Sequence, residues 1–431
     1  MSVNPNVHGL PLSPTIAIND LSDALRQRGQ RIFKLGLGQS PFPVPTTVVE
    51  ALRANAHQKA YLPVLGLPAL REAVADYHRR NHAVACSPED VIVGPGSKEL
   101  MFLLQVVYRG DLVVPVPAWV SYAPQARIVG RTVRPLATRL DSAWRVAPEA
   151  LEDLCRDTFG HPRILVLNYP NNPTGTTYSP AELAALGAVA RRCGVIILSD
   201  EIYGELHHTG AHSSIATLYP EGTILSSGLS KWCGAGGWRL GTFVFPSALR
   251  WLLDAMGAVA SETYTTTSAP IQYAAVEAFR GGIRIERYLW RARRILAALG
   301  REIAARLRAA GLRLADPAGG FYLFPDFAPH RAALARRGIG TSLALTTRLL
   351  EETGVAVLPG SAFGQSEAEL TVRIAYVDFD GARAMAALER KPPDYEIEPS
   401  FLADCCGDVL EATDRICGWL ADLYQSGSAR D

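Results

Sequence analysis

Strand-like apolar runs alternate with helix-like segments along the middle of the chain, and this alternation limits the possible folds more than any other feature. The runs lie at 91–93, 112–116, 164–167, 195–198, 223–225 and 240–245. Between them, apolar residues recur at helical spacing, as at Leu100, Leu103, Leu104 and Val107. Ser179 followed by Pro180 is typical of a helix start. Strands that alternate with helices predict an α/β fold with a largely parallel sheet.

The pattern changes near residue 285 and predicts a second, smaller α+β unit. A long helix at 285–310 ends before Gly311. It is followed by expected strands at 321–324, 355–358 and 370–376 and helices near 341–353 and 380–390. We predict an N-terminal arm that contributes to the small domain (1–50), a large domain (51–285), a small domain (286–390) and a helical tail (391–431). In the arm, one helix is expected at 18–28.

The tail is predicted to be an amphipathic helix. Apolar side chains fall on one helical face at Leu402, Cys406, Val409, Ile416, Leu420 and Leu423. Packing against its own small domain is favoured over recruitment of a partner.

Composition excludes several classes of protein. The 431 residues include 43 basic and 42 acidic side chains, so no strong charge favours nucleic acid or an anionic membrane as a partner. No apolar stretch reaches the 18 residues typical of a membrane span, and no secretory signal is apparent. The seven cysteines form no C-x-x-C pair, which favours a reducing compartment and a cytoplasmic location.

Polar side chains follow three successive strands. Asn172 comes after the run at 164–167, Asp200 and Tyr203 after the next, and Lys231 after the third. The intervals between them match single β-α-β steps. We therefore expect all four at the carboxyl edge of one parallel sheet, where open α/β sheets bind ligands.

An amine, a carboxylate, a phenol and an amide at one edge suit pyridoxal 5′-phosphate. A lysine forms a Schiff base with its aldehyde, and a carboxylate keeps its pyridine nitrogen protonated so that the ring accepts electrons. Backbone N–H groups at Gly96–Lys98, before a helix, could bind its phosphate, and Arg239 could add a bidentate charge. Trp119 could stack on the ring. Arg373, inside an apolar strand, suits a substrate carboxylate.

At these residues the sequence resembles the class I/II aminotransferases, the fold-type-I pyridoxal-phosphate enzymes. The matching pieces occur in the family's order between about residues 30 and 390. They are Lys34–Gly38, Tyr61–Gly66 with Leu70-Arg71, Asn171–Gly175, Ser199–Tyr203, Ser230-Lys231 with Gly237–Gly241, Pro359–Gly364 and Val372–Ala375.

The resemblance implies a role for each matching position. Lys231 would form the Schiff base and move the proton, Asp200 would pair with the pyridine nitrogen, and Tyr203 would act on the ring's O3′ with Asn172. The implied phosphate ligands are Gly96, Ser97, Lys98, Ser230 and Arg239. The implied substrate site comprises Gly38, Trp119, Asn172 and Arg373. Tyr61 would reach the phosphate of a neighbouring subunit, which implies a homodimer with shared active sites.

Three features of the sequence are not explained by the family pattern. Gly228 stands where many members have a phosphate-binding serine. No basic residue is identifiable that must bind a second substrate carboxylate. His207, His208 and His212 could suggest a metal site, but a solvated loop is the favoured interpretation, and no metal is expected.

The leading hypothesis is an aminotransferase that moves an amino group between an α-amino acid and a 2-keto acid by a ping-pong mechanism. An alternative keeps the cofactor but changes the reaction, as in a C–S lyase, a decarboxylase or an eliminating or cyclising enzyme. A third is a non-catalytic binding protein on the same scaffold, which intact Lys231 and Asp200 disfavour.

Overall fold

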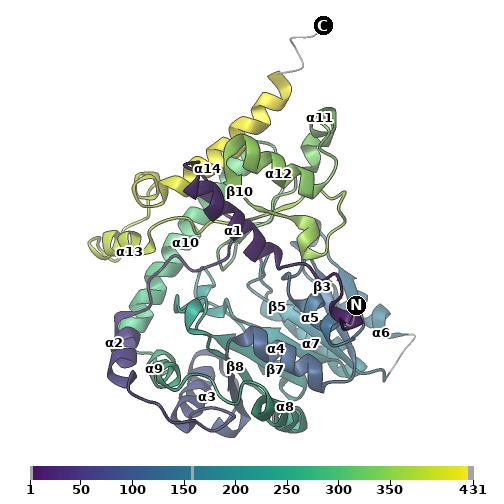
Figure 1. Cartoon of the computed structure of the whole chain (residues 1–431), viewed down its shortest axis with the longest axis vertical. Coiled ribbons are helices and arrows are strands. Elements are labelled where there is room, and N and C mark those ends of the chain that lie inside the picture. Colours follow the sequence, from purple (N-terminus) through teal and green to yellow (C-terminus); the bar gives the residue numbers. More distant parts are fainter. Residues whose placement is uncertain (1–2, 157–159, 426–431) are drawn as a thin grey trace.

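The chain forms two lobes (Figure 1). The lower lobe contains a seven-stranded sheet, and the second lobe, with α11 (Arg331–Arg336), α12 (Ser342–Thr353) and α14 (Pro399–Gln425), is the upper one in this view. The computed structural model describes residues 3–156 and 160–425. The sheet order is β2-β8-β7-β6-β5-β3-β4, and only β8 runs antiparallel to its neighbours. Its strands are β2 (Val91–Gly94), β3 (Asp111–Val116), β4 (Val133–Ala137), β5 (Arg163–Asn168), β6 (Ile196–Asp200), β7 (Thr223–Gly228) and β8 (Gly241–Val244). The predicted α/β fold with a mostly parallel sheet is confirmed.

Helices cover both faces of this sheet because successive strand residues point to opposite sides. Ile164 and Val166 share one cluster with α4 (Ser97–Val107), α5 (Tyr122–Ile128) and α8 (Arg250–Glu262). Leu165 and Leu167 belong to another, with α6 (Pro148–Arg156) and α7 (Pro180–Cys193). The Ser179 side chain caps α7 in a capping box with Glu182, so the expected helix start is confirmed.

The second lobe contains two small sheets. In the first, β1 (Phe33–Lys34) runs parallel to β10 (Val355–Ala356). The second has the order β11-β12-β9, with β9 (Tyr322–Leu323), β11 (Leu358–Pro359) and β12 (Val372–Ala375) antiparallel. The single strand expected at 355–358 is therefore two strands, because Val355 pairs with Phe33 whereas Leu358 pairs with Arg373.

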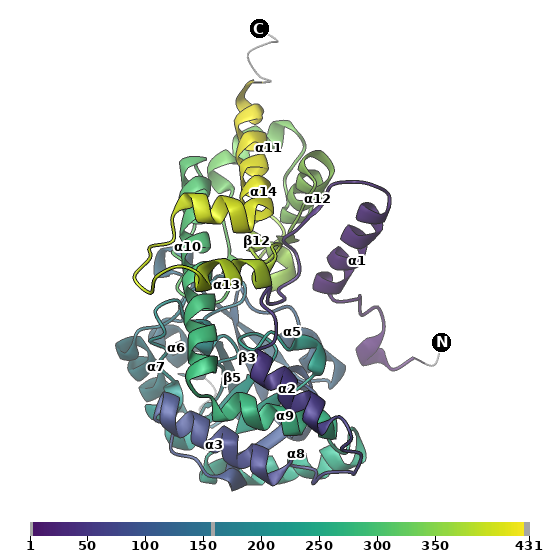
Figure 2. The ribbon, with the colours of Figure 1, turned by 90° about the vertical axis from the view of Figure 1, so that its left-hand side faces the viewer.

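One long helix connects the lobes. The 27-residue α10 (Ile283–Ala309) runs from the lower lobe into the upper one (Figure 2). Beside its start, α2 (Thr46–Asn55), α3 (Pro68–His82) and α9 (Ala269–Arg280) pack together. The upper lobe adds α11, α12 and α13 (Gly381–Glu389).

Segments near both ends of the chain, α1 (Pro14–Gln27) and α14, pack on the upper lobe (Figure 1). Helix α14 buries its apolar face against α10, α12 and α13 and also contacts β1, so the expected packing of the tail on its own lobe is confirmed. Helix α1 begins four residues before the expected start, because Pro14 occupies the first turn, a position where proline is well tolerated. Within the described ranges, every helix is too short or too polar to span a bilayer.

Candidate active site

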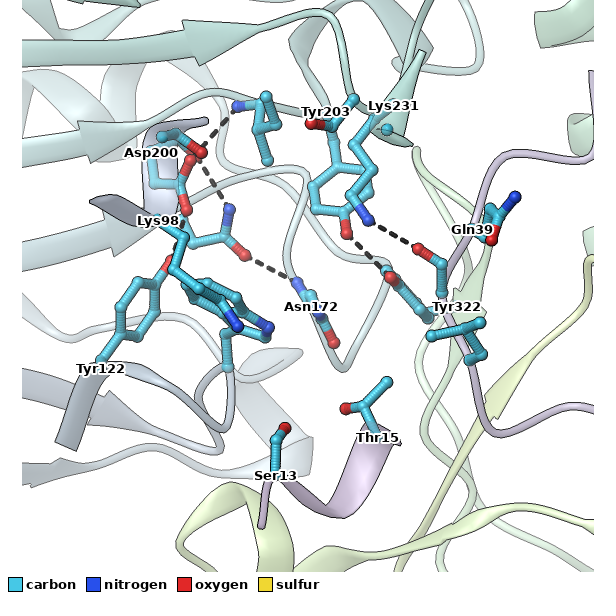
Figure 3. Close-up of a pocket in the computed structure, with 18 of the residues that line it drawn as sticks. Ser13, Thr15, Gln39, Lys98, Tyr122, Asn172, Asp200, Tyr203, Lys231 and Tyr322 are labelled. Carbon is cyan, nitrogen blue, oxygen red and sulfur yellow. Dashed lines mark hydrogen bonds between the residues drawn. The ribbon is translucent and has the colours of Figure 1, made fainter. Parts of the chain in front are cut away.

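A cavity of about 480 Å³ opens at the carboxyl ends of β5, β6 and β7 (Figure 3). Both lobes and the start of α1 line it. It brings together eleven of the residues singled out from the sequence, namely Gly38, Ser97, Lys98, Trp119, Asn172, Asp200, Tyr203, Ser230, Lys231, Arg239 and Arg373. Residues from positions 38 to 373 thus converge because parallel strands present their carboxyl ends at one edge.

Two of the residues singled out from the sequence, Gly96 and Tyr61, are not among those that line the cavity. Gly96 is the residue before α4, where a side chain would lie 2.2 Å from Nη2 of Arg239. Tyr61 is 89% exposed and does not line the cavity of its own chain.

Lys231 follows β7 and its amine is buried. Its Nζ donates to the Gly38 carbonyl at 2.6 Å and lies 5.6 Å from the centre of the Tyr203 ring (Figure 3). Burial, with the nearby positive charges of Arg373, Arg239 and Lys98, lowers its pKa to about 8. A buried amine with this pKa is neutral in part at mild pH, which makes it a nucleophile and a proton acceptor.

Asp200 ends β6 and points into the cavity. Burial raises its pKa to about 6, although the Tyr122 hydroxyl, which donates to its Oδ2 at 2.5 Å, works in the opposite direction. Tyr203 shares a hydrogen bond with Tyr322 at 2.7 Å between the hydroxyl oxygens. Sequence reasoning assigned no role to Tyr122 or Tyr322, because an aromatic residue in or beside an apolar strand is typical of a core.

Arg373 is a buried cation that lacks a carboxylate partner among the described residues. It lies on β12 and is 1% exposed. Its Nη1 donates to the Asn172 side-chain oxygen at 3.1 Å, and Nη2 donates to the Gly36 carbonyl. Its Nε is buried and has no hydrogen-bond partner within the described part of the chain. A buried guanidinium in this condition is suited to an anionic ligand.

An anion-binding corner forms where α4 begins beside β8. A Cβ on Gly241 would lie 2.1 Å from the Ser97 backbone nitrogen, so glycine is required for this close approach. The helix start, Ser230 and Arg239 surround the same end of the cavity. Gly228, the departure from the family pattern, has a physical reason: a Cβ there would lie 2.7 Å from the Leu240 carbonyl oxygen.

Lys98 lies on the cavity wall opposite Lys231 (Figure 3). Its Nζ is 5.0 Å from the centre of the Trp119 ring, and burial and Arg239 lower its pKa. It pairs with no carboxylate among the residues described. Nearby, the start of α1 contributes Ser13, Thr15 and Ile16 to the cavity. Sequence reasoning missed these residues because it placed them in an irregular arm.

The histidine loop is not uniformly solvated, so that prediction is wrong for His212. The His212 side chain is 3% exposed, and its Nε2 lies 2.7 Å from the Glu201 carboxylate. Both ring nitrogens of His208 contact backbone carbonyls, those of Pro317 and Gly320. The partner of His212 was missed because Glu201 lies eleven residues away, on the strand side of the loop.

Comparison with known families gives a match over most of the chain. Residues 30–387 match the model of the aminotransferases of class I and II. This chain belongs to that family. It is 33% identical to the aspartate aminotransferase of Geobacillus stearothermophilus, over 90% of this chain and 96% of that one. It is also 33% identical to the aspartate/prephenate aminotransferase of Thermus thermophilus, over 83% and 90%.

Solved structures agree with the sequence relatives. The aspartate aminotransferase of Thermus thermophilus with maleate superposes with a TM-score of 0.82 at 29% identity, covering 97% of this chain and 99% of that one. The fold is therefore that of a fold-type-I aminotransferase. The protein is a transaminase that uses pyridoxal 5′-phosphate, and a lyase, decarboxylase or eliminating enzyme is not favoured.

The residues present fit this cofactor. The cavity holds an amine, a buried carboxylate, three phenols and an anion-binding corner that only glycines permit. The cofactor, when bound, withdraws electrons from the substrate carbon and so makes its proton removable.

Proposed function

We propose that this cavity is the transaminase active site and that its side chains take the roles implied by the family. Lys231 would hold the cofactor through its amine, and the same amine would move a proton to and from the substrate carbon. Asp200 faces the pyridine nitrogen, while Tyr203 and Asn172 bind the ring hydroxyl. Ser97, Ser230 and Arg239 hold the phosphate with the backbone at Gly96. The observation that carries the proposal is the convergence of buried Asp200 and Arg373 with half-buried Lys231 in one cavity.

The substrate α-carboxylate binds Arg373 in this proposal. Asn172 already accepts a hydrogen bond from Nη1, so the guanidinium is held in place before substrate arrives. Gly38 lets the Tyr322 hydroxyl approach the backbone at the substrate end of the cavity, since a side chain there would collide with that hydroxyl. Trp119 closes the side of the cavity that faces the cofactor ring.

We further propose an acidic amino acid such as aspartate as the donor. The relatives above are named for aspartate, and the solved Thermus enzyme holds maleate, a dicarboxylate. Lys98 is the one exception to the roles implied by the family: instead of a phosphate ligand, we propose it as the cation for a second carboxylate, since Lys231, Arg239 and Arg373 have other roles. It faces the cavity and lacks an acidic partner among the described residues.

Three broader features of the enzyme belong to the same proposal. A homodimer would use exposed Tyr61 at a neighbouring subunit's phosphate. Seven free thiols support a reducing compartment, the cytoplasm. The division at residues 50, 285 and 390 is supported by the position of α10, which begins where the large sheet's helices end.

The test is a half-reaction of the purified, cofactor-loaded enzyme with a panel of single amino acids. We expect aspartate to convert the cofactor to its aminated form, seen by absorbance, with a matching 2-keto acid released. Lys98→Met should raise the KM for aspartate at least tenfold but change the KM for alanine little. If none of the amino acids converted the cofactor, the proposed function would be wrong. If Lys98→Met raised the KM for aspartate and the KM for alanine equally, the proposed role of Lys98 would be wrong.

A further inference from the structure

A buried polar cluster lies behind the turn that carries Asp200 and Tyr203. Asp200, Ile202 and Tyr203 line the cavity, whereas Glu201 and Glu205 point the opposite way into the lobe. These glutamates are 5% and 8% exposed. None of the roles proposed above uses them, although a buried carboxylate next to Asp200 is costly unless it is paired.

Glu201 is held by four groups. Its Oε1 accepts hydrogen bonds from Ser199 Oγ and Ser214 Oγ, both at 2.7 Å, and from the Tyr169 hydroxyl at 3.1 Å. Its Oε2 lies 2.7 Å from His212 Nε2. Burial alone would raise the pKa of Glu201, but the charge of His212 and these hydrogen bonds outweigh it and lower the pKa to about 2. Glu201 is therefore ionised across the working pH range.

His212 is the basic side chain in direct contact with this carboxylate, and His82 also lowers the pKa of Glu201. Arg293, the arginine of the cluster, forms an ion pair with Glu205 and not with Glu201. Glu205 also accepts a hydrogen bond from the Tyr77 hydroxyl. The imidazole of His212 faces the His82 ring at 5.6 Å and the Tyr169 ring at 5.3 Å. Nδ1 of His212 is buried without a partner in the described part of the chain. His78 and His207 lie further out in the same cluster.

The cluster is mechanically and electrically connected to the active site. Glu201 directly follows Asp200, and its backbone N–H donates to Ser226 of β7 at 3.0 Å. Anchoring the Glu201 side chain therefore fixes the turn from which Asp200 and Tyr203 project. The charge of Glu201 also acts on Asp200, whose pKa it raises in addition to the effect of burial.

We propose that Glu201 and His212 are positioning residues for the pyridine end of the cofactor. The pair locks the turn at 200–203, and a positive charge on His212 beside Glu201 reduces the negative charge that reaches Asp200 and the bound cofactor. This inference rests on the proposed role of Asp200 opposite the pyridine nitrogen.

The test uses the cofactor-loaded enzyme and the pH titration of the absorbance of its bound cofactor. His212→Gln keeps a hydrogen-bond donor beside Glu201 but removes the charge. Because the three hydroxyl donors keep Glu201 ionised, the extra negative charge should favour protonation of the bound cofactor. We expect the midpoint of this absorbance titration to rise by about half a pH unit or more in His212→Gln.

The variant Glu201→Gln with His212→Gln removes both charges and should return the midpoint to within about 0.2 pH units of the wild type. His207→Gln, in the same loop but outside the pair, is the matched control and should leave the midpoint unchanged. A merely structural role would lower thermal stability in all cluster variants without moving the midpoint, and would overturn the proposal. Shifts that fail to cancel in the double variant would also overturn it.

A separate variant distinguishes failure of this inference from failure of the proposed site. Asp200→Asn should weaken cofactor binding and change its absorbance if Asp200 faces the pyridine nitrogen. If Asp200→Asn leaves both unchanged, the assignment of the site is wrong. If it changes both while His212→Gln does not move the midpoint, only the role of the pair is wrong.

Discussion

At the scale of single residues, the active site consists of charges that the fold buries without pairing them. Lys231 and Arg373 are enclosed, yet neither meets a carboxylate at ion-pair distance among the described residues. Isolated buried charges destabilise a folded protein unless a ligand completes them. In the proposed site, the cofactor and the substrate carboxylate are the ligands that would complete them.

Lys231 should make the cofactor-free protein less stable below pH 8. Its pKa is lowered to about 8 in the folded chain, so the unfolded chain binds the proton more tightly. Stability should therefore rise between about pH 8 and pH 10.5 and be lowest below that window. At pH 7 we expect the free energy of unfolding of Lys231→Met to exceed that of the wild type by about 3 kcal/mol, at roughly 1.4 kcal/mol per pKa unit. Urea unfolding of both proteins at pH 7 and pH 10 checks this prediction. If the difference between their free energies of unfolding is as large at pH 10 as at pH 7, the prediction is wrong.

Arg373→Lys should impair substrate binding more than turnover. An ammonium cannot bind a carboxylate through two parallel hydrogen bonds or keep the contacts with Asn172 and Gly36 together. We expect the KM for the amino donor to rise roughly 10- to 100-fold and kcat to fall much less. Arg337→Lys, at a surface pair with Glu352, is the control. Steady-state kinetics decide the matter, and an unchanged KM would rule out the assigned contact.

At the scale of elements, the anion-binding corner depends on two chain segments that approach closer than side chains allow. The start of α4 and the start of β8 are in backbone contact at Ser97 and Gly241. This contact places the N–H groups of the helix start where the cavity ends. In the proposed site, the backbone of a strand-to-helix turn thus adds to the side chains of Ser97, Ser230 and Arg239 in binding the phosphate.

Gly241→Ala should weaken cofactor binding. Its Cβ would lie 2.1 Å from the Ser97 nitrogen, which is backbone and cannot rotate away, so α4 must shift. We expect at least a tenfold loss of affinity for pyridoxal 5′-phosphate. Gly237→Ala is the matched control, because Gly237 also lines the cavity but a Cβ there meets nothing within 4 Å. Cofactor titration by fluorescence measures both, and equal affinities would contradict the argument.

The elements also show which parts of the site could be read from the sequence. Asn172, Asp200 and Lys231 were predictable because each follows an apolar strand, and strand order then brings them together. The contribution of Ser13 and Thr15 was not, because α1 reaches the cavity through tertiary packing that no local pattern encodes. Tyr322 and the pairing of His212 were missed because the partners, Tyr203 and Glu201, lie on other elements.

At the scale of the molecule, the upper lobe is assembled from both ends of the chain. Strand β1 pairs with β10, and Arg31, just before β1, forms ion pairs with Asp408 and Glu411 of α14. Helix α14 lies beyond the matched family region, which ends at residue 387. It nevertheless belongs to the largest apolar cluster of the structure, so it is part of the core of this lobe.

Leu420→Ala should destabilise the whole enzyme. Leu420 lies on α14 and is 1% exposed, so truncation leaves a cavity in the core and should cost about 2–5 kcal/mol. Leu343→Ala on α12, at a leucine that is 61% exposed, is the matched control and should change stability by no more than about 0.5 kcal/mol. Denaturant unfolding of the loaded enzymes compares them. Equal losses would show that the tail is not part of the core.

The pairing of β1 with β10 has a consequence for synthesis on the ribosome. Phe33 emerges early, but its partner Val355 is made only after every strand of the large sheet has been translated. At roughly 5–20 residues per second, β1 waits on the order of tens of seconds. During that time the segment that will carry Gly36 and Gly38 has no sheet to join. A nascent chain of this protein therefore gains its substrate-binding wall last, after the sheet that supplies Asp200 and Lys231 is complete.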